Sequence, residues 1–174
     1  MFLYSTLDWS FSEVGAFIAC WVIGYGIVQA SAPQLLKKSH DGAGPGGADA
    51  RFWGIALLLV PTAMALALQY GWDAAWVVVI GLFVFGVVFA INSAVHSYLI
   101  LAYSDFDKVS MNVGFYYMAN AGGRLAGTVL SGLVYQTQGI EGCLWWSAGF
   151  VLVAVVLSAR LPAVRAAVTQ KKAS

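Results

Sequence analysis

The sequence predicts an all-α polytopic membrane protein whose helices form a transmembrane bundle. Hydrophobic residues make up 60% of the 174 residues and charged residues only 10%, against roughly 25% in soluble domains. The apolar residues gather into five long runs, and none alternates apolar and polar residues as the strands of a membrane barrel do. Nine basic and eight acidic residues are too few to cover a soluble globule this apolar. The composition therefore excludes a disordered chain and a nucleic-acid binder.

Five segments reach the length of about 20 mostly apolar residues that a helix needs to cross the hydrocarbon core of a bilayer. We expect spans at about 14–36, 52–72, 74–103, 109–136 and 141–160, which together form a five-helix transmembrane domain over 14–160. The second and fifth spans carry few polar residues and are expected to face lipid. The first, third and fourth carry several, and polar side chains in a membrane favour the bundle interior.

The basic residues predict the orientation of these spans. Eight of the nine Lys and Arg lie on one side, in the connections 37–51 and 105–108 or from residue 160 onward; the connections on the other side contain none. Cytoplasmic loops are enriched in Lys and Arg. We therefore expect residues 1–13 to be extracytoplasmic and 161–174 to form a cytoplasmic tail. The ninth basic residue, Arg124, lies inside the fourth span.

Polar residues at similar depths in three spans predict a shared cavity. In the fourth span Tyr116, Asn120 and Arg124 are spaced by four residues, so they form one inclined stripe on the helix. The first and third spans carry polar residues between mid-bilayer and their cytoplasmic ends. The candidate substrate-binding residues are Tyr25, Gln29, Asn92, His96, Tyr116, Asn120 and Arg124.

Arg124 is the sharpest feature of this set, because a charge at a helix centre costs roughly 2.5–3.5 kcal/mol on insertion scales. No Asp or Glu lies within the five apolar runs from which the spans are predicted. One interpretation is that Arg124 binds an anionic substrate. The other is that it pairs with a backbone carbonyl, or with an acid on a helix that is not part of this sequence. His96 has two interpretations as well, a proton carrier or a hydrogen-bonding structural residue.

A second stripe in the fourth span consists of small residues, which let another helix approach closely. Its members are Ala119, Gly123, Gly127 and Ser131. The chain has two His and two Cys, which give no metal-site spacing, and it has no motif of a hydrolase or of a metalloprotease. We therefore expect neither an enzyme nor a resident metal or cofactor.

The order of polar and plain spans, with the N-terminus outside and the C-terminus inside, resembles the C-terminal half of a major facilitator superfamily transporter. The five spans would match helices eight to twelve of that fold. More narrowly, WVIGYGIVQASAP (21–33) and GFYYMANAGGRLAGT (114–128) resemble the organoarsenical efflux permease branch. This resemblance implies export of an arsenylated phosphoglycerate across a bacterial inner membrane, arsenate resistance, and a functional link to a glyceraldehyde-phosphate dehydrogenase that makes the substrate.

The resemblance also implies an N-terminal half, because alternating access needs two halves that rock about a central site. We expect the chain to be part of a longer transporter and to be inactive on its own. Two alternatives stay open. The chain could be a structural or assembly subunit of a membrane complex, in which Arg124 pairs with an acid of a partner, or an exporter of the same superfamily for another substrate.

Overall fold

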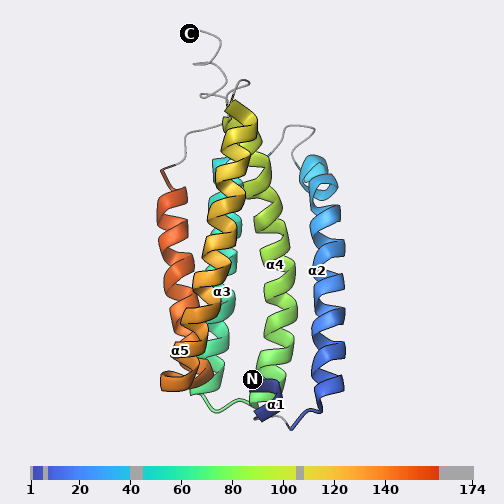
Figure 1. The fold of residues 1–174 in the computed structure, drawn as a ribbon, viewed down its shortest axis with the longest axis vertical. Coiled ribbons are helices and arrows are strands. Elements are labelled where there is room, and N and C mark those ends of the chain that lie inside the picture. The colour runs from blue at the N-terminus through green and yellow to red at the C-terminus, as the bar shows by residue number, and fades with distance from the viewer. Residues whose placement is uncertain (1, 6–7, 40–44, 105–107, 161–174) are drawn as a thin grey trace.

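The computed structural model describes residues 2–5, 8–39, 45–104 and 108–160, and every regular element in these ranges is a helix. A short helix, α1 (Phe2–Ser5), precedes four long ones, α2 (Phe11–Ser39), α3 (Gly47–Gln69), α4 (Ala74–Tyr103) and α5 (Val109–Ser158). The long helices lie side by side along one axis (Figure 1). The predicted all-α class is confirmed, whereas the predicted tail, 161–174, lies outside the described residues.

Capping residues set where α2 begins. The Ser10 hydroxyl donates to Glu13 Oε2 over 2.7 Å, and the Ser10 backbone N–H donates to the same oxygen over 2.8 Å. The Glu13 N–H in turn donates to Ser10 Oγ over 3.3 Å. Such a reciprocal capping box satisfies N–H groups that have no partner inside the helix. The helix therefore begins at Phe11, before the apolar run that predicted a span from residue 14.

Polar residues at the ends of α3 and α4 likewise set helix boundaries that differ from the ends of the apolar runs. The Gly46 N–H donates to Asp49 Oδ2 over 2.7 Å, so α3 begins at Gly47 rather than at residue 52. At its other end Gly71 has φ +77°, a conformation that glycine adopts without steric cost, and the chain turns there. Asp73 then caps α4 by accepting from the Trp76 N–H over 3.1 Å.

Four described helices are long and apolar enough to cross a membrane, namely α2, α3, α4 and α5. The sequence predicts five spans, and the difference arises because the last two predicted spans, 109–136 and 141–160, both fall within α5. Within this element Gly139 has non-helical angles, φ 67° and ψ −161°. The ribbon of α5 turns back on itself (Figure 1). We call its two parts the first limb (109–138) and the second limb (140–158).

The helix α3 packs against both α4 and the second limb of α5, and α2 packs against α4. Two glycines permit close contact between α3 and its two neighbours. A Cβ on Gly81 of α4 would overlap the side chain of Met64, and a Cβ on Gly54 of α3 would lie 2.9 Å from Val155 Cγ2 in the second limb. The buried residues of the core cluster are Ala50, Val95 and Leu99. Many large apolar side chains elsewhere are exposed, as suits a protein surrounded by lipid.

A hydrogen bond from Trp21 fastens α2 to α4. Its indole Nε1–H donates to the Leu82 carbonyl oxygen over 2.7 Å. The indole ring lies over Gly86, where an added Cβ would come within 3.0 Å of Nε1. In the apolar window of α2 no residue is buried within the described part of the chain. A single contact of this kind therefore contributes a larger share of the packing of α2 than of α3.

Replacing Trp21 by phenylalanine is expected to lower the free energy of unfolding by about 1 kcal/mol, because the phenyl ring cannot donate the hydrogen bond. Titration of the protein in mixed micelles with sodium dodecyl sulfate measures this change. Trp76→Phe is the matched control, since Trp76 is an exposed indole on α4. Equal losses for the two variants would show that the bond to Leu82 contributes nothing.

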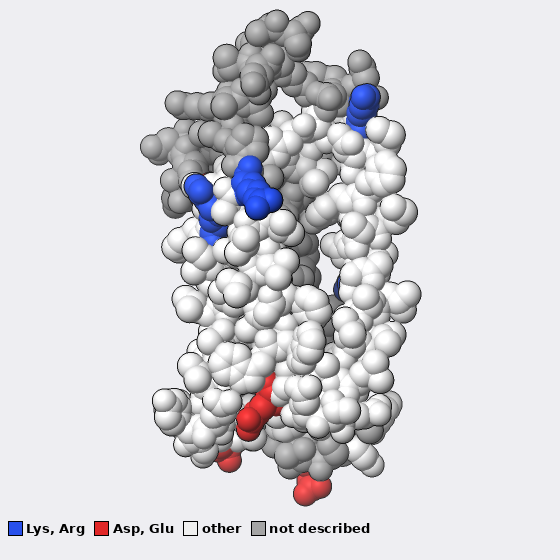
Figure 2. Space-filling model, turned by 90° about the vertical axis from the view of Figure 1, so that its left-hand side faces the viewer, with Lys and Arg blue, Asp and Glu red and all other residues white. Residues whose placement is uncertain are grey.

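Apart from Arg124 in the first limb of α5 and Asp49 near the start of α3, the charged residues of the described chain lie toward opposite ends of the bundle according to their sign. On the face shown in Figure 2 the Lys and Arg side chains gather near one end and the Asp and Glu side chains near the other. The chain order agrees, because Lys108 and Arg160 flank the two ends of α5, whereas Glu141 lies at its reversal. The assignment of the basic end to the cytoplasm stays a prediction.

Candidate functional site

A half-open cavity with one polar wall lies between α3, α4 and both limbs of α5. Its volume is about 320 Å³, which is at the small end of the range of ligand sites. One wall consists of Asn92, Ser93 and His96 on α4, and Tyr116 and Asn120 on the first limb add to it. The opposite wall consists of residues of α3 and the second limb, which are apolar except for Ser158: Ala50, Gly54, Leu57, Phe150, Val151, Ala154, Val155 and Ser158.

Four of the seven predicted substrate-binding residues thus border one cavity: Asn92, His96, Tyr116 and Asn120. They meet because α4 and the first limb leave from the same end of the bundle, and residues at matched depth on the two helices face each other. Their predicted role in substrate binding stays a prediction.

The two polar residues at the centre of the α4 wall differ in how their hydrogen-bonding groups are satisfied. His96 Nδ1 lies 2.9 Å from the Asn92 carbonyl oxygen, one helical turn away. A carbonyl oxygen only accepts, so this hydrogen bond places the ring proton on Nδ1, and in the neutral ring Nε2 is then an acceptor. The side-chain oxygen of Asn92, Oδ1, is buried and has no hydrogen-bond partner among the described residues.

Tyr25 and Gln29, the two predicted site residues on α2, do not line this cavity in the described structure. They contact residues that do. Tyr25 stacks on Phe89 with ring centroids 5.8 Å apart, and Gln29 Nε2 donates to Ser93 Oγ over 3.4 Å. The described lining of this cavity therefore includes no residue of α2, and the role of Tyr25 and Gln29 in substrate binding stays a prediction. The separation has a simple cause, since α4 lies between α2 and the cavity and α2 reaches only its outer face.

Arg124 also lies outside the cavity lining, and it is exposed. It follows Asn120 by one turn on the first limb, and its own carbonyl oxygen accepts from Thr128 Oγ1 over 2.8 Å. The residue stands near the middle of the limb, about 20 Å along the helix axis from either end. The acidic residues of the described chain lie at helix ends, so none of them is at the depth of Arg124.

The predicted small-residue face is exposed along its whole length, at Ala119, Gly123, Gly127 and Ser131. A Cβ added at Gly123 or Gly127 would meet nothing within 4 Å. Gly127 and Ser131 border a small hollow of about 100 Å³ against the second limb. There the Cys143 thiol lies 3.5 Å from the Ser131 carbonyl oxygen. Within the described chain this face is therefore open, and its predicted packing role stays a prediction.

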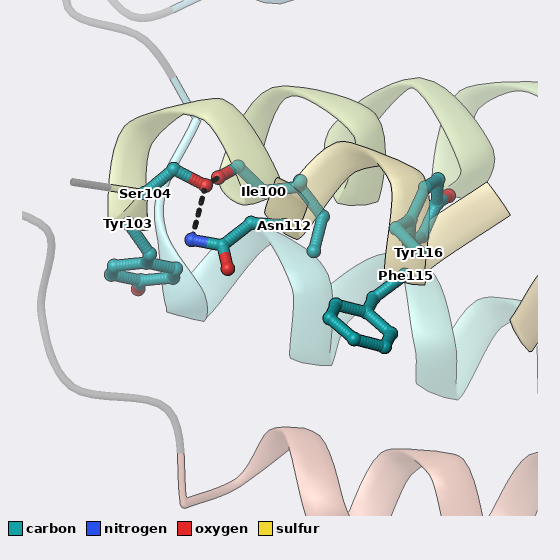
Figure 3. A pocket seen from close by; sticks show the side chains of 6 residues that line it. All are labelled: Ile100, Tyr103, Ser104, Asn112, Phe115 and Tyr116. Carbon is teal, nitrogen blue, oxygen red and sulfur yellow. Dashed lines mark hydrogen bonds between the residues drawn. The ribbon is translucent and has the colours of Figure 1, made fainter. Parts of the chain in front are cut away.

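A second cavity, of about 380 Å³, lies where α4 ends and α5 begins (Figure 3). Asn112 Nδ2 donates to Ser104 Oγ over 3.2 Å, and Ser104 Oγ donates to the Ile100 carbonyl oxygen over 2.6 Å. The side chains of Tyr103, Phe115 and Tyr116 complete its lining. The polar pattern of the sequence did not predict this cavity. The available signal was Asn112, which lies one turn before Tyr116 in the polar stripe.

Comparisons of the chain with models of known protein families, with curated proteins and with solved structures gave no match. In the described residues no group of three or more His, Cys, Asp or Glu side chains could hold a metal ion. The fold and the composition together define a coarse class: an all-α chain with several helices of membrane-spanning length, the plan of a multi-pass membrane protein.

Proposed function

We propose that the chain is the solute-binding part of a membrane transporter whose solute is a small organic anion. The observation that carries this proposal is Arg124, an exposed cation in the middle of the first limb of α5, one turn from Asn120. A charge at such a depth is costly, and residues of this kind mark ion and substrate pathways in membrane proteins. A solute with its own negative charge offsets that cost when it binds.

The particular transporter we propose is an organoarsenical efflux permease of the major facilitator superfamily, on the resemblance of 21–33 and 114–128. On this proposal the substrate is an arsenylated phosphoglycerate, and the chain supplies helices eight to twelve. The basic end of the bundle then faces the cytoplasm of a bacterium, because cytoplasmic connections are enriched in Lys and Arg. An exporter of the same superfamily for another anion would need the same Arg124.

Replacing Arg124 by glutamine is expected to weaken the binding of 3-phosphoglycerate, a stable anionic probe, by about ten- to a hundredfold, because a charged hydrogen bond is lost. The measurement is calorimetry on the full chain in lipid nanodiscs. Arg124→Lys should keep part of the affinity, since lysine supplies the charge without the planar fork. Arg160→Gln is the matched control, because Arg160 is exposed near the end of α5. Equal affinity in Arg124→Gln and in the parent chain contradicts the proposal.

A second candidate function, a structural subunit of a membrane complex, is favoured by the exposed small-residue face. Gly123 lies directly before Arg124 and has open space around it, so a partner helix could approach closely there and place a carboxylate beside the guanidinium. The same variants separate the candidates. If Arg124→Gln removes the chain from the membrane but leaves probe affinity unchanged in the remaining protein, the structural function is favoured.

A further inference from the structure

We infer that the cavity between α3, α4 and α5 is a binding site for a small neutral solute that carries hydroxyl donors. The inference goes beyond the proposed function, because it does not involve Arg124 and holds whether or not the chain takes part in transport. It depends on two acceptor groups of the α4 wall, Asn92 Oδ1 and His96 Nε2, of which Asn92 Oδ1 has no hydrogen-bond partner in the described part of the chain.

The first observation is a pair of acceptor groups on the α4 wall. Asn92 Oδ1 is buried without a hydrogen-bond partner in the described part of the chain. One turn on, the contact between His96 Nδ1 and the Asn92 carbonyl oxygen leaves Nε2 of the neutral ring as an acceptor. Both residues line the cavity. Leaving such a group unpaired costs about 1–3 kcal/mol, so an occupant that donates hydrogen bonds to this wall is stabilised.

The second observation is that the cavity lining is uncharged. The described residues that border the cavity include no Lys, Arg, Asp or Glu. An anion buried there would have no Lys or Arg beside it, and a cation would have no Asp or Glu as counter-ion. The chemistry of the wall therefore favours a neutral molecule. Two acceptors on successive turns of one helix suit a molecule with two adjacent hydroxyl groups.

The third observation is the size of the cavity. Water commonly satisfies buried polar groups, but one water molecule takes up only about 30 Å³ in the liquid, against a cavity of about 320 Å³. The apolar wall formed by Leu57, Phe150 and Val151 offers water no hydrogen bonds. An organic molecule with a carbon skeleton against this wall and hydroxyl groups against α4 satisfies both sides.

Ethylene glycol is the probe that tests this inference, and 1,2-dimethoxyethane is its matched control, since it has the same skeleton without any donor. Each is titrated into the full chain in lipid nanodiscs, and the ring nitrogens of His96 are followed by NMR. The sequence has two histidines, so His40→Ala leaves His96 as the reporter. We expect a saturable shift of the Nε2 signal with ethylene glycol and none with 1,2-dimethoxyethane, inorganic phosphate or methylammonium at the same concentrations.

The variant Asn92→Leu, of similar shape, is expected to weaken the apparent affinity for ethylene glycol by about two- to tenfold, the effect of losing one neutral hydrogen bond. Asn112→Leu is the matched control, because Asn112 lies at the second cavity, and it should leave the affinity unchanged. A saturable response to phosphate or to methylammonium but not to ethylene glycol overturns the inference, as does a response to none of the probes, which would mean that water alone fills the cavity. The probe comparison needs no variant, so poor folding of Asn92→Leu does not remove the test.

Discussion

Replacing Gly139 by valine is expected to lower the free energy of unfolding by about 1–3 kcal/mol, the usual cost of a side chain held in a disallowed backbone region. The angles at Gly139, φ 67° and ψ −161°, lie in a region that essentially only glycine occupies. Valine at this position either holds the same strained backbone angles or forces a different reversal between the two limbs of α5. Titration with sodium dodecyl sulfate measures the loss of stability.

A cross-link between the limbs distinguishes strain from a changed reversal. Ser131 and Cys143 line the same small hollow between the limbs, so we expect Ser131→Cys to form a disulfide with Cys143 on mild oxidation in a Cys20→Ser background. Loss of this disulfide in Gly139→Val would show that the limbs have separated. Gly149→Val is the matched control, because a Cβ at Gly149 meets nothing within 4 Å. Unchanged stability of Gly139→Val would mean that the reversal does not need glycine.

Replacing Gly81 by valine is expected to destabilise the contact between α3 and α4 by about 1–3 kcal/mol, as overpacking of a core does. Gly81 and Met64 are both buried. A Cβ at Gly81 would overlap the Met64 side chain, including Cγ at 2.7 Å. The new side chain must push α4 away from α3 or force Met64 out of its place. The same detergent titration measures the effect.

A double variant tests whether Met64 is the cause. Met64→Ala alone should cost about 2–5 kcal/mol by leaving a cavity. In the double variant with Gly81→Val, the added side chain fills part of that cavity. The double variant should therefore be more stable, by about 0.5–3 kcal/mol, than the sum of the two single effects predicts. Gly114→Val is the matched control, since Gly114 has open space around it. Strict additivity would show that the two side chains do not compete for the same space.

The candidate site was predictable in part, and the reason lies in the helix geometry. Asn92 and His96 are spaced by four residues, as are Tyr116 and Asn120, and residues spaced in this way share a helix face. The sequence therefore predicts two polar faces, and the structure brings them to one cavity. Periodicity says nothing of which helices are neighbours. Tyr25 was assigned to the same cavity by depth alone, although α4 separates α2 from it.

The helix α5 shows a second limit of sequence patterns. Hydropathy predicts two spans with a break near residues 137–140, and the break does occur at Gly139. A glycine in an apolar run can equally remain helical, as Gly123 and Gly127 do. Whether a given glycine bends the chain depends on what the following segment packs against, here α3.

Properties that depend on one residue at a time, or on spacing along one helix, follow from the sequence. These include the all-α class, the apolar helices of spanning length, the concentration of basic residues in alternate connections, and the unusual depth of Arg124. The arrangement of the helices does not follow, because it depends on close contacts between residues far apart in the chain. Gly81 against Met64 and Gly54 against Val155 are such contacts. They bring α3, α4 and α5 together, so that the cavity forms between these helices with neutral walls and leaves Arg124 outside its lining.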